Sequence, residues 1–180
     1  MRNSNKTVSE CLYVLIQQIA KMSALVPETG LLTGKIGIAI LLYHYARYRN
    51  DMKIKECVEN LMNIAVHEIS LEAGKDFESG LCGIAWGIDY LMKQGFVEAD
   101  EDIFDEIDIA LLQENIEELN TCDLETESET LLYLWNRLKF SEPSAKKSGK
   151  KILHTTWKRF KTLFFQDTRV IHFPCFNVEV

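Results

Sequence analysis

Three acidic residues near the second of two glycine-rich phrases are the side chains best placed for acid–base chemistry in this sequence. Asp76 and Glu78 precede the phrase "SGLCGIA", and Asp89 follows it. Paired carboxylates at the mouth of a cavity can act as general acid and general base, as they do in glycoside hydrolysis. Loop carboxylates more commonly contact solvent or cap a helix, and we favour this interpretation for all three.

Cysteine and histidine do not form a pattern typical of a metal site. The cysteines contain no C-x-x-C pair and are widely spaced, at positions 11, 57, 82, 122 and 175. This odd number of distant cysteines favours reduced thiols in a cytosol over a disulfide framework. The closest possible ligand pair is His172 with Cys175 in "HFPC", which we interpret as packing of the tail. We interpret His44, in "LLYHYAR", as a histidine packed between aromatic residues, and we predict no metal or other cofactor in this chain.

The two glycine-rich phrases form an internal repeat. Gly34-x-x-Gly37-Ile-Ala recurs as Gly80-x-x-Gly83-Ile-Ala, and the offset is 46 residues. Glycine costs about 1 kcal/mol in a helix interior relative to alanine, so its repetition at a helix start indicates a need for bare backbone. Either neighbouring helices crowd together there, which we favour, or a ligand approaches the amide groups. No strand precedes the phrases and no G-K-[ST] follows, so they are not a P-loop or a dinucleotide site.

Apolar residues at helical spacing predict the elements that must position these groups. We predict helices over residues 8–19, 34–48, 51–69, 83–95, 102–119, 131–138 and 152–164. A period in the forties made of helix pairs is typical of stacked αα-hairpins. The sequence therefore predicts an all-α fold, an α/α toroid-like array of about three hairpins in an incomplete ring. We expect its cavity to be faced by Gly34, Gly37, Gly80, Gly83, Asp76 and Asp89.

Composition and charge exclude several classes of protein. A hydrophobic content of 47% is typical of a globular chain, and a net charge of −7 disfavours binding to nucleic acid. No apolar run is long enough to cross a membrane, and the first ten residues contain no export signal, so we expect a cytoplasmic protein. Residues 98–129 carry fourteen acidic and no basic side chains, whereas residues 137–161 carry nine basic side chains and one Glu. We expect these two surfaces to attract each other, within one chain or between two, although the acidic one would also attract a basic peptide.

The phrases "TGKIGIAILLYHYAR" and "GLCGIAWGIDYL" resemble the N-terminal half of the lanthionine synthetase C-like family. The resemblance covers roughly residues 10–140. It implies an α/α toroid in which the glycine-rich phrases begin inner helices, while residues 51–69 and 102–119 form outer ones. It also implies the activity of the family's cyclases, in which zinc activates a peptide cysteine that adds to a dehydrated serine or threonine to form a thioether.

The chain departs from that family in its second half. The zinc ligands of the family lie in a Cys motif and a Cys-His-Gly motif, and neither occurs here, so we carry over no metal or catalytic residue. We divide the chain into hairpin repeats over residues 1–142 and a degenerate final helix with an aromatic tail over residues 143–180. The expected protein is a truncated or degenerate cyclase domain, inactive alone.

Two other functions remain open at this point. One is a non-catalytic helical scaffold that binds a peptide or a peptide-modifying enzyme, and the other is a carbohydrate-active toroid that uses the carboxylates. An open array leaves apolar flanks with nothing to stack on. We therefore expect a homodimer, with the aromatic tail covering one flank through Ile171, Phe173 and Phe176.

Overall fold

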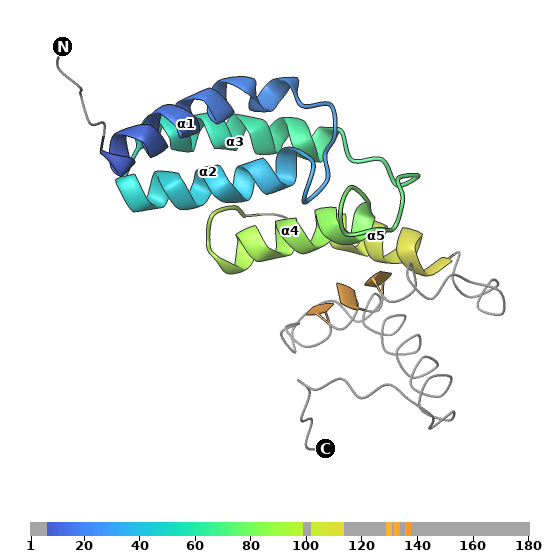
Figure 1. Cartoon of the computed structure of the whole chain (residues 1–180). Helices are drawn as coiled ribbons and strands as arrows, with labels where there is room; N and C mark the ends of the chain where they lie inside the picture. The colour runs from blue at the N-terminus through green and yellow to red at the C-terminus, as the bar shows by residue number, and fades with distance from the viewer. Residues whose placement is uncertain (1–6, 99–101, 114–128, 131, 134–135, 138–180) are drawn as a thin grey trace, which may run out of the picture. The chain divides into compact units, whose positions relative to one another are not determined.

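The structure is a computed structural model that describes residues 7–98 and 102–113 together with residues 129, 130, 132, 133, 136 and 137. Its elements, in chain order, are α1 (Val8–Met22), the 3-10 turn η1 (Ser23–Leu25), α2 (Lys35–Arg49), α3 (Met52–His67), α4 (Leu81–Lys93) and α5 (Asp102–Gln113) (Figure 1). The six described residues between 129 and 137 are helical as well. No strand occurs in this part of the chain, so the predicted all-α fold is confirmed. The predicted boundary after residue 142, the last helix and the aromatic tail lie outside the described residues.

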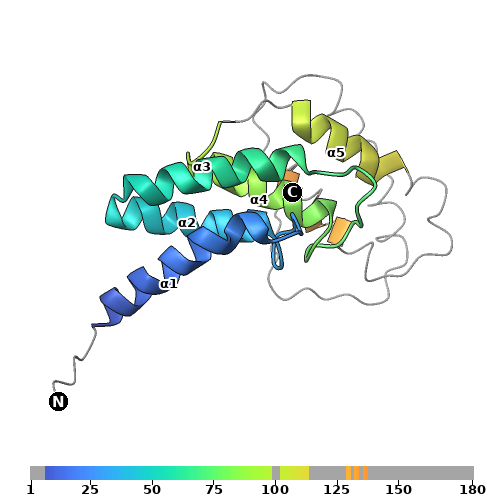
Figure 2. The same cartoon turned by 90° about the horizontal axis from the view of Figure 1, so that it is seen from above.

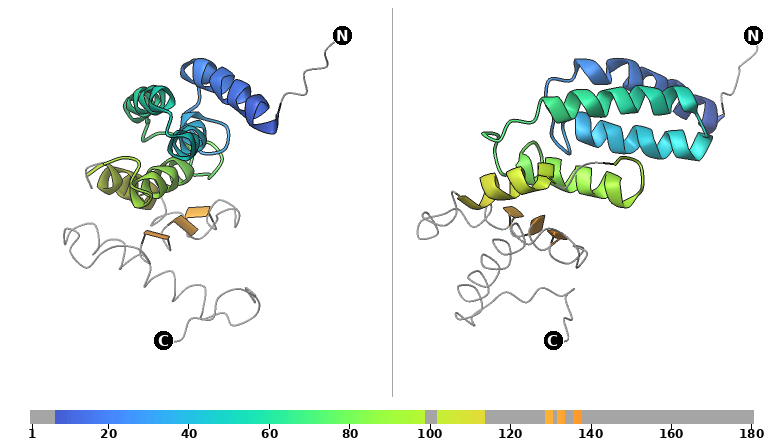
Figure 3. Two further views of the ribbon diagram at one scale, coloured as in Figure 1. Left: turned by 90° about the vertical axis from the view of Figure 1, so that its left-hand side faces the viewer. Right: turned by 180° about the vertical axis from the view of Figure 1, so that it is seen from behind.

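The helices stack as successive antiparallel hairpins. Helix α2 lies between the pair α1 and α3 on one side and α4 on the other, and α4 in turn contacts α5 (Figures 1 and 3). Helices α2 and α3 therefore form one hairpin, and α4 and α5 form the next. This arrangement confirms the predicted array of helical hairpins.

The helix boundaries follow local signals in the sequence. Asp51 is the N-cap of α3, and its side chain accepts hydrogen bonds from the amides of Lys53 and Ile54, at 3.0 and 3.2 Å. Helix α4 begins two residues earlier than predicted and ends before Gly95, which has a φ of 64°. The amide of Gly95 bonds to Met92 and that of Phe96 to Leu91, which is the Schellman pattern that a glycine in the left-handed region permits.

The core lies where α3 and α4 pack against α2. Four apolar residues recur at helical spacing along α3 and all are buried, namely Ile54, Val58, Leu61 and Ala65. Helix α4 is buried over most of its length, because α2 covers one side and α5 another. Helix α5 is buried at Ile107 and Leu111, which are 1% and 0% exposed.

Helix α1 shows that apolar spacing alone does not bury a residue. Val8, Leu12 and Leu15 have the predicted helical spacing, yet they are 86%, 40% and 57% exposed. Only Ile16 and Ala20 of this helix are buried. The reason is visible in Figure 2, where α1 runs at an angle to α2 and α3 and its N-terminal half diverges from them. The first two turns of α1 therefore present an unpartnered apolar face.

Candidate functional site: two glycine-rich helix starts

The loop before each glycine-rich helix folds back over the first turn of that helix. A Cβ atom at Gly37 would lie 1.9 Å from the carbonyl oxygen of Leu31, and one at Gly83 would lie 2.1 Å from that of Phe77. The two contacts are equivalent, because each joins a glycine to the carbonyl six residues earlier. Bare backbone is therefore required by the loop itself, and not by a neighbouring helix as the sequence suggested.

Amide groups at both helix starts are already hydrogen-bonded within the chain. The bonds run from Lys35 to Glu28 at 3.0 Å, from Ile36 to Thr29 at 3.2 Å, from Leu81 to Gly74 at 2.7 Å and from Gly83 to Asp76 at 3.4 Å. In each pair the donor lies seven residues after the acceptor. These loop carbonyls take the place that an anion would occupy at an open helix N-terminus.

The two helix starts lie side by side. The amide of Leu32 donates a 2.9 Å hydrogen bond to the carbonyl oxygen of Glu78. A Cβ atom at Gly30 would lie 2.5 Å from the Cα of Ser79, so the two loops touch through their backbones. Helices α2 and α4 therefore begin at the same end of the array, with their repeated phrases in register. That the glycines face a central cavity stays a prediction.

Asp76 shapes the loop before α4. Its Oδ1 accepts hydrogen bonds from the amides of Ser79 and Gly80, at 2.7 and 3.2 Å, and from the hydroxyl of Ser79 at 3.1 Å. The amide of Ser79 contributes most to lowering the pKa of this carboxyl, burial opposes it, and the remaining hydrogen bonds add to it. Asp76 thus acts within the loop, as a turn-forming carboxylate, and it does not cap α4, whose N-cap is Gly80 with no side-chain hydrogen bond.

Asp89 lies further along α4 and has different partners. It is 8% exposed and forms an ion pair with Lys93, one turn later on the same helix. The side-chain amide of Asn136 donates to the same Oδ2 atom at 3.4 Å. Eight residues separate Asp89 from Leu81, which is about 12 Å along a helix axis. Asp76 and Asp89 thus belong to two separate networks and do not form an acid–base pair in this structure.

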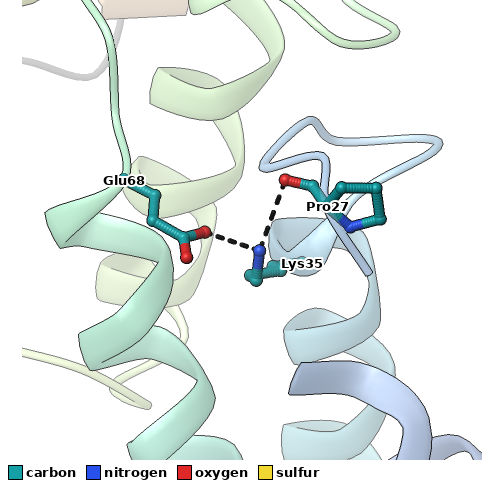
Figure 4. Close-up of polar contacts among 3 residues, drawn as sticks. All are labelled: Pro27, Lys35 and Glu68. Carbon is teal, nitrogen blue, oxygen red and sulfur yellow. Dashed lines mark hydrogen bonds and ion pairs between the residues drawn. The ribbon is translucent and has the colours of Figure 1, made fainter. Parts of the chain in front are cut away.

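Lys35, the residue after Gly34, is a buried cation that the sequence did not single out. Only 2% of it is exposed, and its Nζ lies 2.5 Å from a carboxylate oxygen of Glu68 and 3.4 Å from the carbonyl oxygen of Pro27 (Figure 4). Glu68 is the C-cap of α3, whereas Pro27 lies in the loop before α2. The ammonium group therefore joins the first helix start to the end of the next helix.

A second buried polar cluster joins α5 to the helical residues that follow. The hydroxyl of Tyr133 donates to Asp108 at 2.5 Å, and the guanidinium of Arg137 lies 3.4 Å from the same carboxylate. Arg137 also stacks over the ring of Phe104, 4.3 Å from its centroid. Burial raises the pKa of Asp108, and the charge of Arg137 opposes that rise. Asp108 belongs to the acidic segment 98–129 and Arg137 to the basic segment 137–161. Their ion pair is of the kind expected if the two segments attract each other within one chain.

Aromatic residues connect the second halves of α2 and α4. The His44 ring lies 5.8 Å from that of Tyr90 and 5.0 Å from that of Phe96, between centroids. Its Nε2 is 2.8 Å from the Tyr90 hydroxyl oxygen. The predicted packing of His44 between aromatic residues is confirmed.

The described thiols do not fit a zinc site. Cys82 is fully buried, its Sγ lies 3.8 Å from the hydroxyl oxygen of Thr130, and burial raises its pKa to about 12. Cys57 donates to the carbonyl of Ala20 at 3.6 Å, and Cys11 is exposed on α1. A zinc site needs thiolates, neutral imidazoles or carboxylates that converge on one point. In the described part of the chain, no three residues among His, Cys, Asp and Glu gather in that way.

Comparisons with known proteins place this arrangement in a family. Among the described residues, no helix combines the length and apolar character that a bilayer crossing requires. No curated protein and no solved structure gives a significant match to the chain. The model of the lanthionine synthetase C-like protein family matches residues 2–169, nearly the whole sequence. With its repeated glycine-rich helix starts on stacked hairpins, the chain therefore belongs to the lanthionine synthetase C-like family.

Proposed function

We propose that this chain acts in peptide modification as a lanthionine synthetase C-like domain that binds peptide but does not form thioether rings by itself. The family match over residues 2–169 supports a role on peptides. The state of the thiols supports the lack of cyclisation, and it is the observation that carries the proposal. Ring formation in this family needs a zinc-held thiolate, and the described residues offer no set of ligands for that ion.

A cyclisation assay tests the proposal. The purified chain is incubated with a peptide that contains one dehydroalanine and one cysteine, with and without added zinc. Ring formation consumes the free thiol without changing the peptide mass, so the product is measured by alkylation of the remaining thiol. We expect the same thiol loss as in a sample without protein, and less than one zinc per chain by elemental analysis. Stoichiometric zinc together with faster thiol loss would show that the chain is a cyclase.

The alternative is a non-catalytic helical scaffold that binds a peptide or a partner enzyme, a role that requires no set of zinc ligands among the described residues. Helix α1 exposes an apolar face formed by Val8, Leu12 and Leu15. Such a face on a helical array commonly marks a contact with another protein. We propose that a second copy of the chain covers it, which gives a homodimer in the cytoplasm. A carbohydrate-active role has less support, because Asp76 is hydrogen-bonded within its own loop and Asp89 is paired with Lys93.

A further inference from the structure

A groove of about 760 Å³ lies between α3 and the segment that follows α4. Side chains from residues 59–67 of α3 line one wall, and residues 95–98 line the other. Tyr43 of α2 and Ile88 of α4 also line it, and because they are only 3% and 1% exposed they form its floor. The groove is thus built by three helices and a loop.

The wall formed by residues 95–98 is held in place by α2. The ring of Phe96 stacks on that of Tyr43, with 5.1 Å between centroids, and the guanidinium of Arg47 lies 3.6 Å above the same ring. Arg47 also donates hydrogen bonds to the carbonyl oxygens of Gln94 and Gly95, at 2.6 and 3.4 Å. A wall fixed in this way costs a ligand little ordering entropy when it binds.

The chemistry of the groove is apolar at its base and acidic at its rim. Met62, Val66, Ile88 and Phe96 supply apolar surface, and Glu59 and Glu98 supply two negative charges. No Lys or Arg is among the lining residues, although Lys55 approaches Glu59 from outside, at 3.7 Å with both side chains half exposed. An exposed pair of this kind is weak and is readily exchanged for another cation.

We propose that this groove binds a peptide segment in which a Lys or Arg side chain lies next to an apolar side chain. The apolar side chain enters between Val66 and Phe96, and the cation pairs with Glu59 or Glu98. Charge complementarity carries the choice of a basic partner, because the chain is acidic overall and the described lining residues include Glu59 and Glu98 but no Lys or Arg. The guanidinium of Arg47, over the ring of Phe96, is already hydrogen-bonded to the carbonyl oxygens of Gln94 and Gly95. That the partner is a peptide rests on the proposed function.

Two substitutions on α3 with equal exposure give the sharpest test. Val66 and Ile64 are each 38% exposed, but only Val66 lines the groove. Binding of a short fluorescent peptide of alternating Lys and Leu is measured by anisotropy at low salt, beside a Glu–Leu peptide of the same length. We expect Val66→Lys to weaken binding of the basic peptide by about tenfold, since it adds a like charge inside the groove. Ile64→Lys, which carries the same charge elsewhere on the helix, changes binding by less than about twofold.

A second pair of variants tests the rim. Glu59→Gln with Glu98→Gln removes two charges from the groove. The control, Glu56→Gln with Glu72→Gln, removes two charges from exposed positions of α3 and the loop after it, neither of which lines the groove. We expect the first pair to weaken binding about two- to fivefold and the control pair to have little effect. Circular dichroism of each variant shows that the helices are intact.

The outcomes separate this inference from the proposed function. Equal losses in Val66→Lys and Ile64→Lys, or equal binding of the basic and acidic peptides, would overturn the groove as the site, while peptide binding by the chain would stand. Absence of binding by either peptide would also overturn the groove proposal. The cyclisation assay does not use these peptides, so its result is independent of both outcomes.

Discussion

The amide of Leu32 donates a hydrogen bond to the carbonyl oxygen of Glu78, and this bond joins the two repeats of the chain. It connects the loop before α2 to the loop before α4, 46 residues later in the sequence. Because each loop also bonds to the first turn of its own helix, the two helix starts form one continuous backbone network.

Adding a methyl group to the repeated glycines should destabilise the fold. Gly37→Ala and Gly83→Ala each place a Cβ about 2 Å from a loop carbonyl oxygen, so the loop must move away from the helix. We expect each variant to lose about 1–3 kcal/mol of unfolding free energy in urea denaturation. The sign of this change is informative, because replacing an unobstructed helical glycine by alanine raises the unfolding free energy by up to about 1 kcal/mol. Stabilisation by either variant would show that the loop does not press on the helix.

Replacing Lys35 and replacing Glu68 should lower the unfolding free energy by different amounts. Lys35 is 2% exposed, whereas the Glu68 side chain is 46% exposed. Glu68→Ala leaves a buried ammonium with a carbonyl as its remaining recorded partner, and we expect a loss of about 2–3 kcal/mol in unfolding free energy. Lys35→Met leaves a carboxylate that water can reach, so we expect a loss of about 1 kcal/mol or less. The reverse order in thermal or urea unfolding would contradict this asymmetry.

Cys82 should be unreactive in the folded protein. Burial raises the pKa of its thiol to about 12, so almost none of it is thiolate at about pH 8, and the side chain is fully buried. We expect iodoacetamide to alkylate the exposed Cys11 within minutes and to leave Cys82 unmodified, as measured by peptide mass spectrometry. Labelling in urea is the control, in which both thiols react. Equal rates under native conditions would show that the start of α4 is open.

Asp76 should contribute stability that depends on pH. Its pKa is lowered in the folded state, so the folded protein binds this proton less readily than the unfolded chain does. The contribution is therefore fully present above the ordinary pKa of about 4 and is lost as the pH falls through the lowered value. Asp76→Asn keeps an acceptor oxygen, and we expect it to reduce the difference in unfolding free energy between about pH 6 and pH 3 by less than about 1 kcal/mol, because solvent screens the group. An unchanged pH profile would contradict this role.

The exposed face of α1 should mediate self-association. Leu15→Lys introduces a charge into the apolar face, and we expect it to convert a homodimer into a monomer in analytical ultracentrifugation at micromolar concentration. Leu71→Lys is the control, because Leu71 is 46% exposed in the loop after α3, away from α1. Sedimentation of the wild-type chain as a monomer would contradict the predicted homodimer.

The fold was predictable because its signals are local. Periodic apolar residues defined α3, and a glycine past the last turn of α4 marked its end through the left-handed conformation of Gly95. The repeated phrase predicted stacked hairpins, and the bond between Leu32 and Glu78 shows that the two copies do adjoin. The exposed positions of α1 were not predictable, since exposure depends on which helix lies opposite, and spacing does not contain that information.

The side-chain networks were less predictable than the fold. The buried pairing of Lys35 was not predictable, because its partner Glu68 is 33 residues away in sequence. Asp108 carried a signal that could have been used, since a carboxylate between Ile107 and Leu111 interrupts an apolar face and requires a buried partner. The groove left no trace in the sequence, because its lining residues come from three helices and one loop.

The equivalent closure of the two helix starts has a consequence for how such a chain changes length. Each helix start obtains its capping carbonyls from the loop directly before it. A loop and the helix start that follows it therefore form one structural unit. Recombination between the two glycine-rich phrases would remove one 46-residue repeat. It would leave one helix start, with its own loop, at the junction. Loss of a whole repeat therefore keeps the bonds within the remaining start, whereas an insertion between a loop carbonyl and its helix amide changes the seven-residue spacing of those bonds.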